Sequence, residues 1–481
     1  MFIIDLIRIL SVLLAIVGTT FLIPVGVALY CGETNVLLPF LVPMLISWIL
    51  CLVITLIFKK RKITLNIRKT YVVVACCWIF TSIFGMIPMF ASRAIPNFTD
   101  AFFESVSGFS TTGGTILGNI EALPRSINMW RCLTHWLGGM GIVALTVALL
   151  PLLGVGGFQL IKAETTGPEK GKVTAKITTT AKILWISYLI LTVLQAIFLK
   201  IFGMDFIDAF AHAFSTLGTG GFSTRTSSIG AYNSTAIDVI CTVFMLLAGI
   251  NFSLFYFAVR GKWREIYENS ELKAYLGTFA FFALSIALCI TKIYGSFWIA
   301  LKHSAFQTAS IITTTGFSTV DFMDWPSTAQ FFIFVLFFVG GCSGSTGGGF
   351  KVIRWVILFK QVNNEIRKMI HPHGVFSLRL NNNPARKELV FSVASFLLLY
   401  LFLILVTTFV GCLGKLDIFT AFTGAVSMVG NIGPGFGILS ASGNYGFLPA
   451  FVKWWYCFAM LAGRLELYTM MIFFVPAYWK K

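Results

Sequence analysis

Four loop segments rich in glycine, serine and threonine contain the residues of this sequence that are best suited to chemistry. We number them loop segments 1 to 4 in chain order: "DAFFESVSGFSTTGGT", "DAFAHAFSTLGTGGFST", "AFQTASIITTTGFST" and "AFTGAVSMVGNIGPGFG". We find no catalytic Ser/His/Asp set, carboxylate dyad or metal cluster in a common loop. Their glycines allow backbone angles, including positive φ, that a Cβ forbids, and their threonines add hydroxyl oxygens. This combination favours coordination of a cation by peptide and hydroxyl oxygens.

The loop segments repeat in register, which indicates internal duplication. One glycine aligns in all four, and a phenylalanine stands ten residues before it in three of them, with Thr423 as the exception. The aligned glycines are Gly113, Gly220, Gly316 and Gly433, and the phenylalanines are Phe103, Phe210 and Phe306. A step of small residues follows about 25 to 30 residues later, at Gly138-Gly139, Ala248-Gly249, Gly340-Gly341 and Ala462-Gly463. Two landmarks in the same order, four times over, predict four copies of one unit.

The elements that must position these segments are membrane spans. The chain has 481 residues, of which 57% are hydrophobic and 11% charged, and a mean hydropathy of +0.85, which is typical of polytopic membrane proteins. Apolar runs long enough to cross about 30 Å of hydrocarbon occur ten times. They are 6–30, 37–58, 71–90, 128–151, 183–202, 236–259, 276–295, 326–361, 388–411 and 447–478.

These runs predict an all-α polytopic membrane protein. Two N-terminal transmembrane helices precede four units, each made of a span, a short half-helix, a polar loop and a second span. The predicted parts are 1–68 for the two N-terminal spans, then 69–175, 176–270, 271–380 and 381–481 for units 1 to 4.

The basic residues indicate which side of the membrane each loop occupies. Of the 36 Lys and Arg residues, 23 lie in alternate loops and at the C-terminus, whereas nine lie in the intervening loops and at the helix ends that flank them. By the positive-inside rule the richer side is cytoplasmic, and an even number of spans puts both termini there as well. This topology, with contact to anionic lipid of the bilayer, accounts for the net charge of +17. We see no aromatic-interleaved basic patch for nucleic acid.

Polar loops at membrane depth must face inward, because unpaired peptide groups are tolerated there only against protein or water. Four loops around one axis would present rings of carbonyl oxygens that replace the hydration shell of an alkali cation. The short stretch before each loop then becomes a half-helix, whose C-terminal end directs roughly half a negative elementary charge at that axis. Acids at the starts of these half-helices, Asp100, Asp208 and Asp417, complement the positive helix end in a capping role. The alternative is attraction of cations at the pore mouth.

The eighth apolar run is interrupted by "GGCSGSTGGG", which we call the glycine segment (Gly340–Gly349). Six of its ten residues are glycine. Each glycine in a helix interior costs about 1 kcal/mol relative to alanine, so we expect the helix to break beside a cavity. It is not a Walker A loop, because Gly349-Phe350-Lys351 stands where G-K-[ST] is required. Close helix packing through small residues is the alternative role.

Arg464 lies within the tenth apolar run, where an arginine costs about 2.5 to 3.5 kcal/mol on insertion scales. We expect it to bond to carbonyls of the glycine segment and to raise the barrier to cations. The alternative is a structural pair with a buried acid. Three histidines on apolar stretches, His135, His212 and His303, are interpreted as hydrogen-bonded packing residues.

The four loop segments and "GGCSGSTGGGFK" at Gly340–Lys351 resemble the Trk/Ktr/HKT superfamily of cation transporters. The two additional N-terminal spans and the chain length fit its Trk-type potassium-uptake membrane subunits (TrkH/TrkG-like). The resemblance implies a pseudo-fourfold pore within one chain, a homodimer and a place in the bacterial cytoplasmic (inner) membrane. It also implies K⁺ entry controlled by a cytoplasmic TrkA-like regulatory subunit that binds NAD(H) and ATP or ADP, with no cofactor in this chain.

Carried over by position, the resemblance implies a K⁺ selectivity filter with three residues from each loop segment. These are Thr111, Thr112 and Gly113; Gly218, Thr219 and Gly220; Thr314, Thr315 and Gly316; and Asn431, Ile432 and Gly433. A serine in place of the first filter glycine goes with sodium permeability in related plant proteins, so Gly113 favours potassium.

In this family the glycine-rich segment is an intramembrane loop that obstructs the pore beneath the filter. The resemblance therefore implies a gate made of Gly340, Gly341, Gly344, Ser345, Thr346, Gly347, Gly348, Gly349 and Arg464. The function this predicts is gated, channel-like potassium uptake. The alternative is a proton- or sodium-coupled cation symporter, because coupled transporters also use repeats and broken helices. Those folds commonly have inverted repeats, whereas all four polar loops here lie on one side, which favours the channel.

Overall fold

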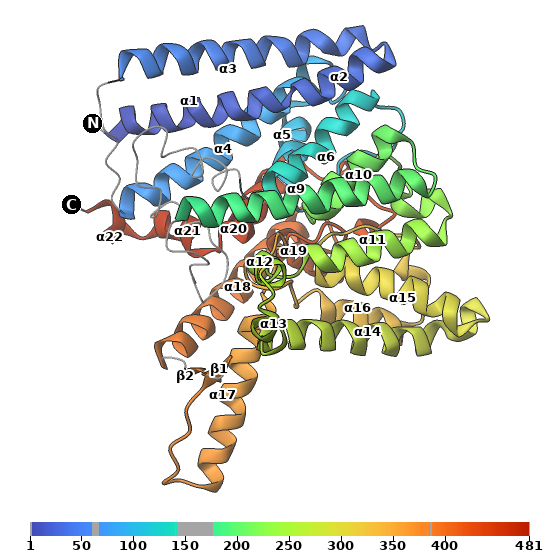
Figure 1. Cartoon of the computed structure of the whole chain (residues 1–481), viewed down its shortest axis with the longest axis vertical. Coiled ribbons are helices and arrows are strands. Elements are labelled where there is room, and N and C mark those ends of the chain that lie inside the picture. Colours follow the sequence, from blue (N-terminus) through green and yellow to red (C-terminus); the bar gives the residue numbers. More distant parts are fainter. Residues whose placement is uncertain are drawn as a thin grey trace.

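The computed structural model describes residues 2–59, 67–139, 141, 177–381, 383–384 and 387–480. Helices dominate this part of the chain (Figure 1), and its one sheet is the short antiparallel pair β1 (Arg379–Leu380) and β2 (Asn383–Pro384). The predicted all-α fold is confirmed. The end of the fourth apolar run, 142–151, and the basic stretch 162–176 lie outside the described residues.

The N-terminal pair of spans forms a layer at one edge of the molecule (Figure 1). Helices α1 (Phe2–Thr20) and α2 (Leu22–Cys31) make one apolar stretch, and the turn η1 (Thr34–Val36) leads into α3 (Leu37–Ile57), which packs on α1. Glu33 at this turn accepts hydrogen bonds from the backbone N–H groups of Arg125 (2.7 Å) and Ser126 (3.1 Å). The N-terminal pair is thereby attached to the first unit.

Each of the four units begins with a long, unbroken helix. These helices are α4 (Ile67–Ala91), α9 (Ile177–Ile201), α14 (Ser270–Tyr294) and α18 (Lys387–Leu413). With the two N-terminal stretches they give six helices in the described chain that are long and apolar enough to cross a membrane. They correspond to six of the ten predicted apolar runs.

The second helix is interrupted in units 2, 3 and 4, and the expectation of a continuous span is wrong for units 2 and 4. Helices α11 (Thr235–Ala248) and α12 (Phe252–Val259) are bent by 93°, and the chain is bent by 118° after α20 (Ala450–Arg464), where α21 (Tyr468–Met471) and η6 (Ile472–Phe474) follow. Helix α6 (Arg125–Gly139) ends at its small-residue step, and α16 (Ser327–Leu336) is separated from α17 (Val352–Ile370) by the glycine segment. Only this last break was predicted.

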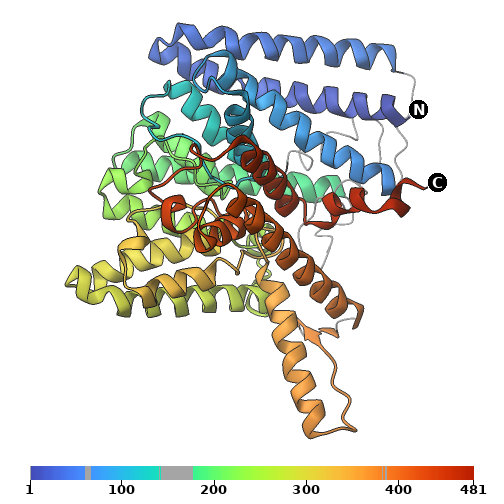
Figure 2. The ribbon, with the colours of Figure 1, turned by 180° about the vertical axis from the view of Figure 1, so that it is seen from behind.

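Between the two helices of each unit lies the predicted half-helix. The four are α5 (Phe98–Phe109), α10 (Phe206–Leu217), α15 (Phe297–Ile312) and α19 (Ile418–Gly430). The turns η3 (Ser228–Tyr232), η4 (Phe322–Asp324) and η5 (Gly437–Leu439) lie in the connections that follow three of them, and α13 (Trp263–Tyr267) and α22 (Pro476–Trp479) complete the helices. Seen from behind (Figure 2), the C-terminal unit in red lies against the first unit in blue, and α20 packs on α5.

The acids near the starts of the half-helices have three different roles. Asp417 is the N-cap of α19 and accepts from the N–H of Thr420 (3.0 Å), as predicted. Asp100 instead binds the ammonium of Lys453 (2.6 Å). Asp208 binds Arg225 (3.2 Å) and accepts from the hydroxyl of Tyr232. Both acids lie in the first turn of their half-helix, where a negative charge complements the helix dipole, but neither is the N-cap residue.

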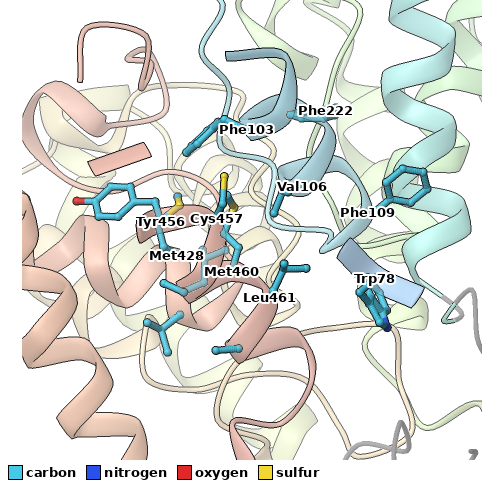
Figure 3. Close-up of a cluster of buried hydrophobic side chains, with 14 of the residues drawn as sticks. Trp78, Phe103, Val106, Phe109, Phe222, Met428, Tyr456, Cys457, Met460 and Leu461 are labelled. Carbon is cyan, nitrogen blue, oxygen red and sulfur yellow. The ribbon is translucent and has the colours of Figure 1, made fainter. Parts of the chain in front are cut away.

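Tightly packed apolar side chains stand behind the loop segments (Figure 3). Phe103, Val106 and Phe109 of α5 gather with Met460 and Leu461 of α20, and all of them are buried. Because lipid is as apolar as these side chains, close packing and not transfer from water holds such helices together. The cluster therefore fixes how α5 and α20 lie relative to each other.

Candidate functional site

The C-terminal ends of the four half-helices share one backbone conformation. In each, a residue with positive φ is followed by one whose N–H donates to the carbonyl of a serine five residues earlier. The positive-φ residues are Thr111 (57°), Thr219 (53°), Thr314 (57°) and Asn431 (53°). The bonds run from Thr112 to Ser107 (2.9 Å), Gly220 to Ser215 (2.9 Å), Thr315 to Ser310 (2.8 Å) and Ile432 to Ser427 (2.9 Å).

These bonds correct the register of loop segment 2 by one residue. The glycine that follows each bonded residue has a φ of 80° at Gly113, 82° at Gly221, 81° at Gly316 and 103° at Gly433. Gly221, and not Gly220, is therefore equivalent to Gly113. The equivalent triplet is Thr219, Gly220 and Gly221, and Gly218 is the C-cap of α10.

The phenylalanine landmark caused this error, because Phe210 stands ten residues before Gly220. In the corrected register that position is Ala211. Two signals in the sequence give the right answer: "GFST" begins at both Gly221 and Gly316, and a serine stands six residues before the glycine in all four segments.

The four loop segments form a closed ring. A Cβ added to each of the four glycines would come within 2.7 Å or less of a carbonyl oxygen in the next segment. Gly113 faces the oxygen of Gly220, Gly221 that of Thr315, Gly316 that of Ile432, and Gly433 that of Thr112. The order 1, 2, 3, 4 thus returns to 1. These positions require glycine both for positive φ and for this close approach.

His135 explains why loop segment 2 has a second glycine. Its ring lies where a side chain on Gly220 would stand. Its Nε2 accepts from the N–H of Phe222 (3.2 Å), so Nδ1 carries the proton and donates to the carbonyl of Gly108 (2.8 Å). A neutral imidazole therefore links loop segments 1 and 2. The packing interpretation is confirmed for His135, for His212, which bonds to Asp208 and Ser223, and for His303, which bonds to Thr319.

A buried ion pair that the sequence did not reveal supports the same two segments. Glu104 of α5 binds Arg131 of α6 at 2.6 Å, and both side chains are fully buried. The carboxylate also accepts from the hydroxyl of Thr115 (2.9 Å) and the N–H of Ile116 (3.0 Å). The guanidinium lies over the ring of Phe222, 4.3 Å from its centroid. The pair thus connects the backbone after Gly113 with loop segment 2.

A hollow opens above the ring and touches all four segments. Its lining includes the four positive-φ glycines, Gly113, Gly221, Gly316 and Gly433. Serines on the half-helices hold some neighbouring carbonyls: Ser107 donates to Gly114 and Ser310 to Phe317, both at 2.6 Å. The described residues contain no group of three or more His, Cys, Asp or Glu side chains that could hold a metal ion. A cation at the ring would therefore meet neutral oxygens.

The glycine segment lies directly beneath the ring. Two backbone bonds close its base, from Gly340 to Phe350 (2.9 Å) and from Val352 to Gly341 (3.2 Å). Its N–H at Gly348 donates to the hydroxyl oxygen of Thr314 (2.7 Å).

The glycine segment also bonds to the break between α11 and α12. Cys342 donates to the carbonyl of Gly249 (2.9 Å), and Phe252 donates to the carbonyl of Gly344 (3.1 Å). The segment is therefore anchored both to loop segment 3 and to the second unit.

Arg464 bridges three units from its position at the end of α20. Its guanidinium donates to the carbonyl of Thr346 (2.7 Å) and to those of Gly138 (2.6 Å) and Gly139 (2.8 Å). The predicted bond to a carbonyl of the glycine segment is present. Glu466, two residues later, forms an ion pair with Arg354.

Charged groups at the base of the glycine segment were missed in the sequence. Glu271 of α14 accepts from the N–H groups of Ser343 (2.6 Å), inside the segment, and Ile353 (3.3 Å), just after it. The ammonium of Lys351 donates to the carbonyl of Gly347. Lys351 and Arg354 stand inside the eighth apolar run, and this rarity of charge in a span is the signal that marks them.

Comparison with known proteins adds independent findings. A family model described as "TrkH: Cation transport protein" matches residues 43–301 and 296–481. The chain is 41% identical over 423 residues to the Trk system potassium uptake protein TrkH of Halomonas elongata, covering 87% of each chain. It is 36% identical over 485 residues to the protein of the same name from Vibrio parahaemolyticus, covering 99% of each. The crystal structure of the potassium transporter TrkH from Vibrio parahaemolyticus matches with a TM-score of 0.86 and 33% identity over 100% of both chains.

Proposed function

We propose a mechanism for this chain, which belongs to the TrkH family of cation transport proteins and is a potassium-uptake transporter. In this mechanism K⁺ passes passively through a carbonyl-lined filter with a gate beneath it. It is a transport protein and not an enzyme, because its relatives are Trk potassium transporters.

The closed ring of loop segments carries this proposal. Equivalent carbonyls from the four segments, those of Thr112, Gly220, Thr315 and Ile432, each face the glycine of a neighbouring segment. Oxygens so arranged can replace the hydration shell of K⁺, and the four half-helix C-termini add negative potential. The proposed filter triplets are Thr111–Gly113, Thr219–Gly221, Thr314–Gly316 and Asn431–Gly433.

The glycine segment and Arg464 are the proposed gate. The segment lies against Thr314 and is bonded by Arg464 at Thr346, so conduction requires it to move aside. The arginine also places a positive charge near the pathway, which raises the barrier to a cation. Removing the segment should leave a pore that leaks.

Two partners belong to the proposal. The first is a cytoplasmic TrkA-like regulatory subunit that binds NAD(H) and ATP or ADP and controls the gate. The second is another copy of this chain, for which α17 offers a surface: the helix projects from the body (Figure 1). Its exposed apolar side chains are Phe359, Val362, Ile366, Met369 and Ile370. We place the protein in the bacterial inner membrane with both termini in the cytoplasm.

Tracer flux in proteoliposomes tests the passive mechanism against a coupled symporter. We expect passive entry of radiolabelled rubidium, driven only by the K⁺ gradient, when Na⁺ is absent and a protonophore removes any proton gradient. Flux that stops under these conditions and returns with an imposed H⁺ or Na⁺ gradient would establish the symporter instead. Growth of a transport-deficient strain on limiting potassium, with and without a deletion inside Gly340–Gly349, checks the assignment in cells.

A further inference from the structure

The four residues at the inner end of the proposed filter present different side-chain oxygens. Thr219 donates its hydroxyl to the carbonyl of Gly218 (2.7 Å). Thr111 Oγ1 and Asn431 Oδ1 are buried without a hydrogen-bond partner. Thr314 Oγ1 accepts from the N–H of Gly348 in the glycine segment (2.7 Å).

Buried oxygens of this kind suit a desolvated cation. A polar atom left unpaired in the interior costs about 1 to 3 kcal/mol, so each such atom in a native structure requires an explanation. Thr111 and Asn431 are fully buried and belong to the same set of positive-φ positions as Thr314. Together these three side chains offer oxygen ligands at the end of the filter that faces the glycine segment.

The glycine segment contacts two of these three side chains. A Cβ on Gly348 would lie 3.0 Å from Asn431 Oδ1, and one on Gly347 would lie 3.4 Å from Thr314 Oγ1. The N–H of Gly348 directs its partial positive charge at the Thr314 oxygen and so weakens that oxygen as a cation ligand.

We propose that Thr314 is a K⁺ ligand at the inner end of the filter whose oxygen is occupied by Gly348 when the gate is closed, so that gate and ion compete for one atom. This inference rests on the proposed function and adds a regulatory role to one filter residue. Opening frees the hydroxyl for K⁺, and by linkage K⁺ bound there opposes closing. Thr219 has no such role, because its hydroxyl bonds within its own segment.

The test uses the full chain reconstituted without a regulatory partner, with rubidium leak as the first readout. Thr314→Val removes the hydroxyl oxygen that accepts from Gly348 and keeps the shape of the side chain. It should raise the leak by about two- to tenfold, the change expected from losing one buried hydrogen bond. Thr314→Ser keeps a hydroxyl and should restore the low leak. The control Thr291→Val removes a hydroxyl that bonds to the Ala287 carbonyl within α14 (2.7 Å), and it should leave the leak unchanged.

A second background separates the gate role from the filter role. In a chain lacking Gly347–Gly349, Thr314→Val should no longer raise the leak, because its partner is gone, but it should still lower the preference for K⁺ over Na⁺. Equal leak in Thr314→Val and Thr291→Val, or an undiminished increase in the deletion background, would overturn the inference. If Thr314→Val does not insert, Thr314→Ala tests the same contact. Absence of any rubidium flux in the unmodified chain, even with its partner, would instead contradict the proposed function.

Discussion

The ring of loop segments is regular, whereas the layer of helices beneath it is irregular. In the ring, four segments share the same positive-φ positions and the same bond to a serine carbonyl. Beneath it, the second helices of units 2, 3 and 4 are interrupted in different ways, by bends of 93° and 118° or by the glycine segment. Equal surroundings suit an ion that must meet similar oxygens on all sides, whereas a moving part has to differ from its neighbours. Under the proposed function, selectivity belongs to the ring and control to the inner layer.

Substitution at Gly113 should distort the ring and should have the largest effect of the predicted changes, a loss of K⁺ over Na⁺ preference. Gly113→Ala places a Cβ against the Gly220 carbonyl at a φ of 80°. Strain of this kind costs about 1 to 3 kcal/mol, so we expect the K⁺ over Na⁺ preference to fall by roughly a hundredfold at most. The measurement is competitive tracer flux.

The matched control for Gly113 is Gly277→Ala on α14, where an added Cβ meets nothing within 4 Å. Alanine there improves helix propensity by about 1 kcal/mol, and selectivity should stay as it was. Equal selectivity in both variants would show that the ring does not discriminate between ions.

Substitution at Arg464 should break the inner layer without changing the ring. Arg464→Ala removes three bonds to backbone carbonyls, and hydrogen bonds to charged groups contribute about 1.5 to 3 kcal/mol each. We expect the leak to rise about tenfold or more with the K⁺ over Na⁺ preference retained. Arg464→Lys keeps the charge but not the planar fork of the guanidinium, so its leak should lie between that of the parent and that of Arg464→Ala. An unchanged leak in Arg464→Ala would remove this residue from the gate.

Glu271→Gln sharpens the comparison with a smaller change. The amide keeps the shape but weakens two charge-assisted bonds at the base of the glycine segment. The leak should rise severalfold, corresponding to about 1 kcal/mol. Glu365→Gln on α17, where Glu365 accepts from Gln361 at an exposed position, is the control and should match the parent. A fall in K⁺ selectivity without leak would contradict the division between ring and inner layer.

The smallest effect is expected at the outer rim, where Arg125 binds Asp205. The hydrogen bond from this guanidinium lowers the pKa of Asp205. A carboxylate with a lowered pKa stabilises the fold above its ordinary pKa, and the contribution is lost as pH falls through the lowered value.

Thermal unfolding of the parent and of Asp205→Asn measures this contribution. Because both side chains are half exposed, the difference should stay below about 1 kcal/mol at pH 7 and should disappear in acid. A difference that grows on acidification would show that the sign is wrong.

The fold was largely predictable from the sequence because its signals are local. Apolar runs, half-helices and glycine clusters depend on residues that are adjacent in sequence. Six long helices and four half-helices match these predictions. The register of loop segment 2 was predicted one residue off because the alignment followed Phe210, although the repeated "GFST" and the serine six residues before the glycine give the right register. The pairs Glu104–Arg131 and Arg354–Glu466 join residues distant in sequence, and no periodicity encodes such contacts. The bends of α11/α12 and α20/α21 were missed because apolar composition alone cannot tell a straight span from a broken one.

A single chain supplies all four quarters of the ring, and this has a consequence for how such a filter can vary. In an assembly of four identical subunits, one codon change alters every quarter at once. Here the four equivalent positions, Thr112, Gly220, Thr315 and Ile432, already carry three different residue types while their carbonyls face equivalent neighbours. A single substitution, natural or engineered, can therefore change selectivity through one loop segment while the other three stay the same.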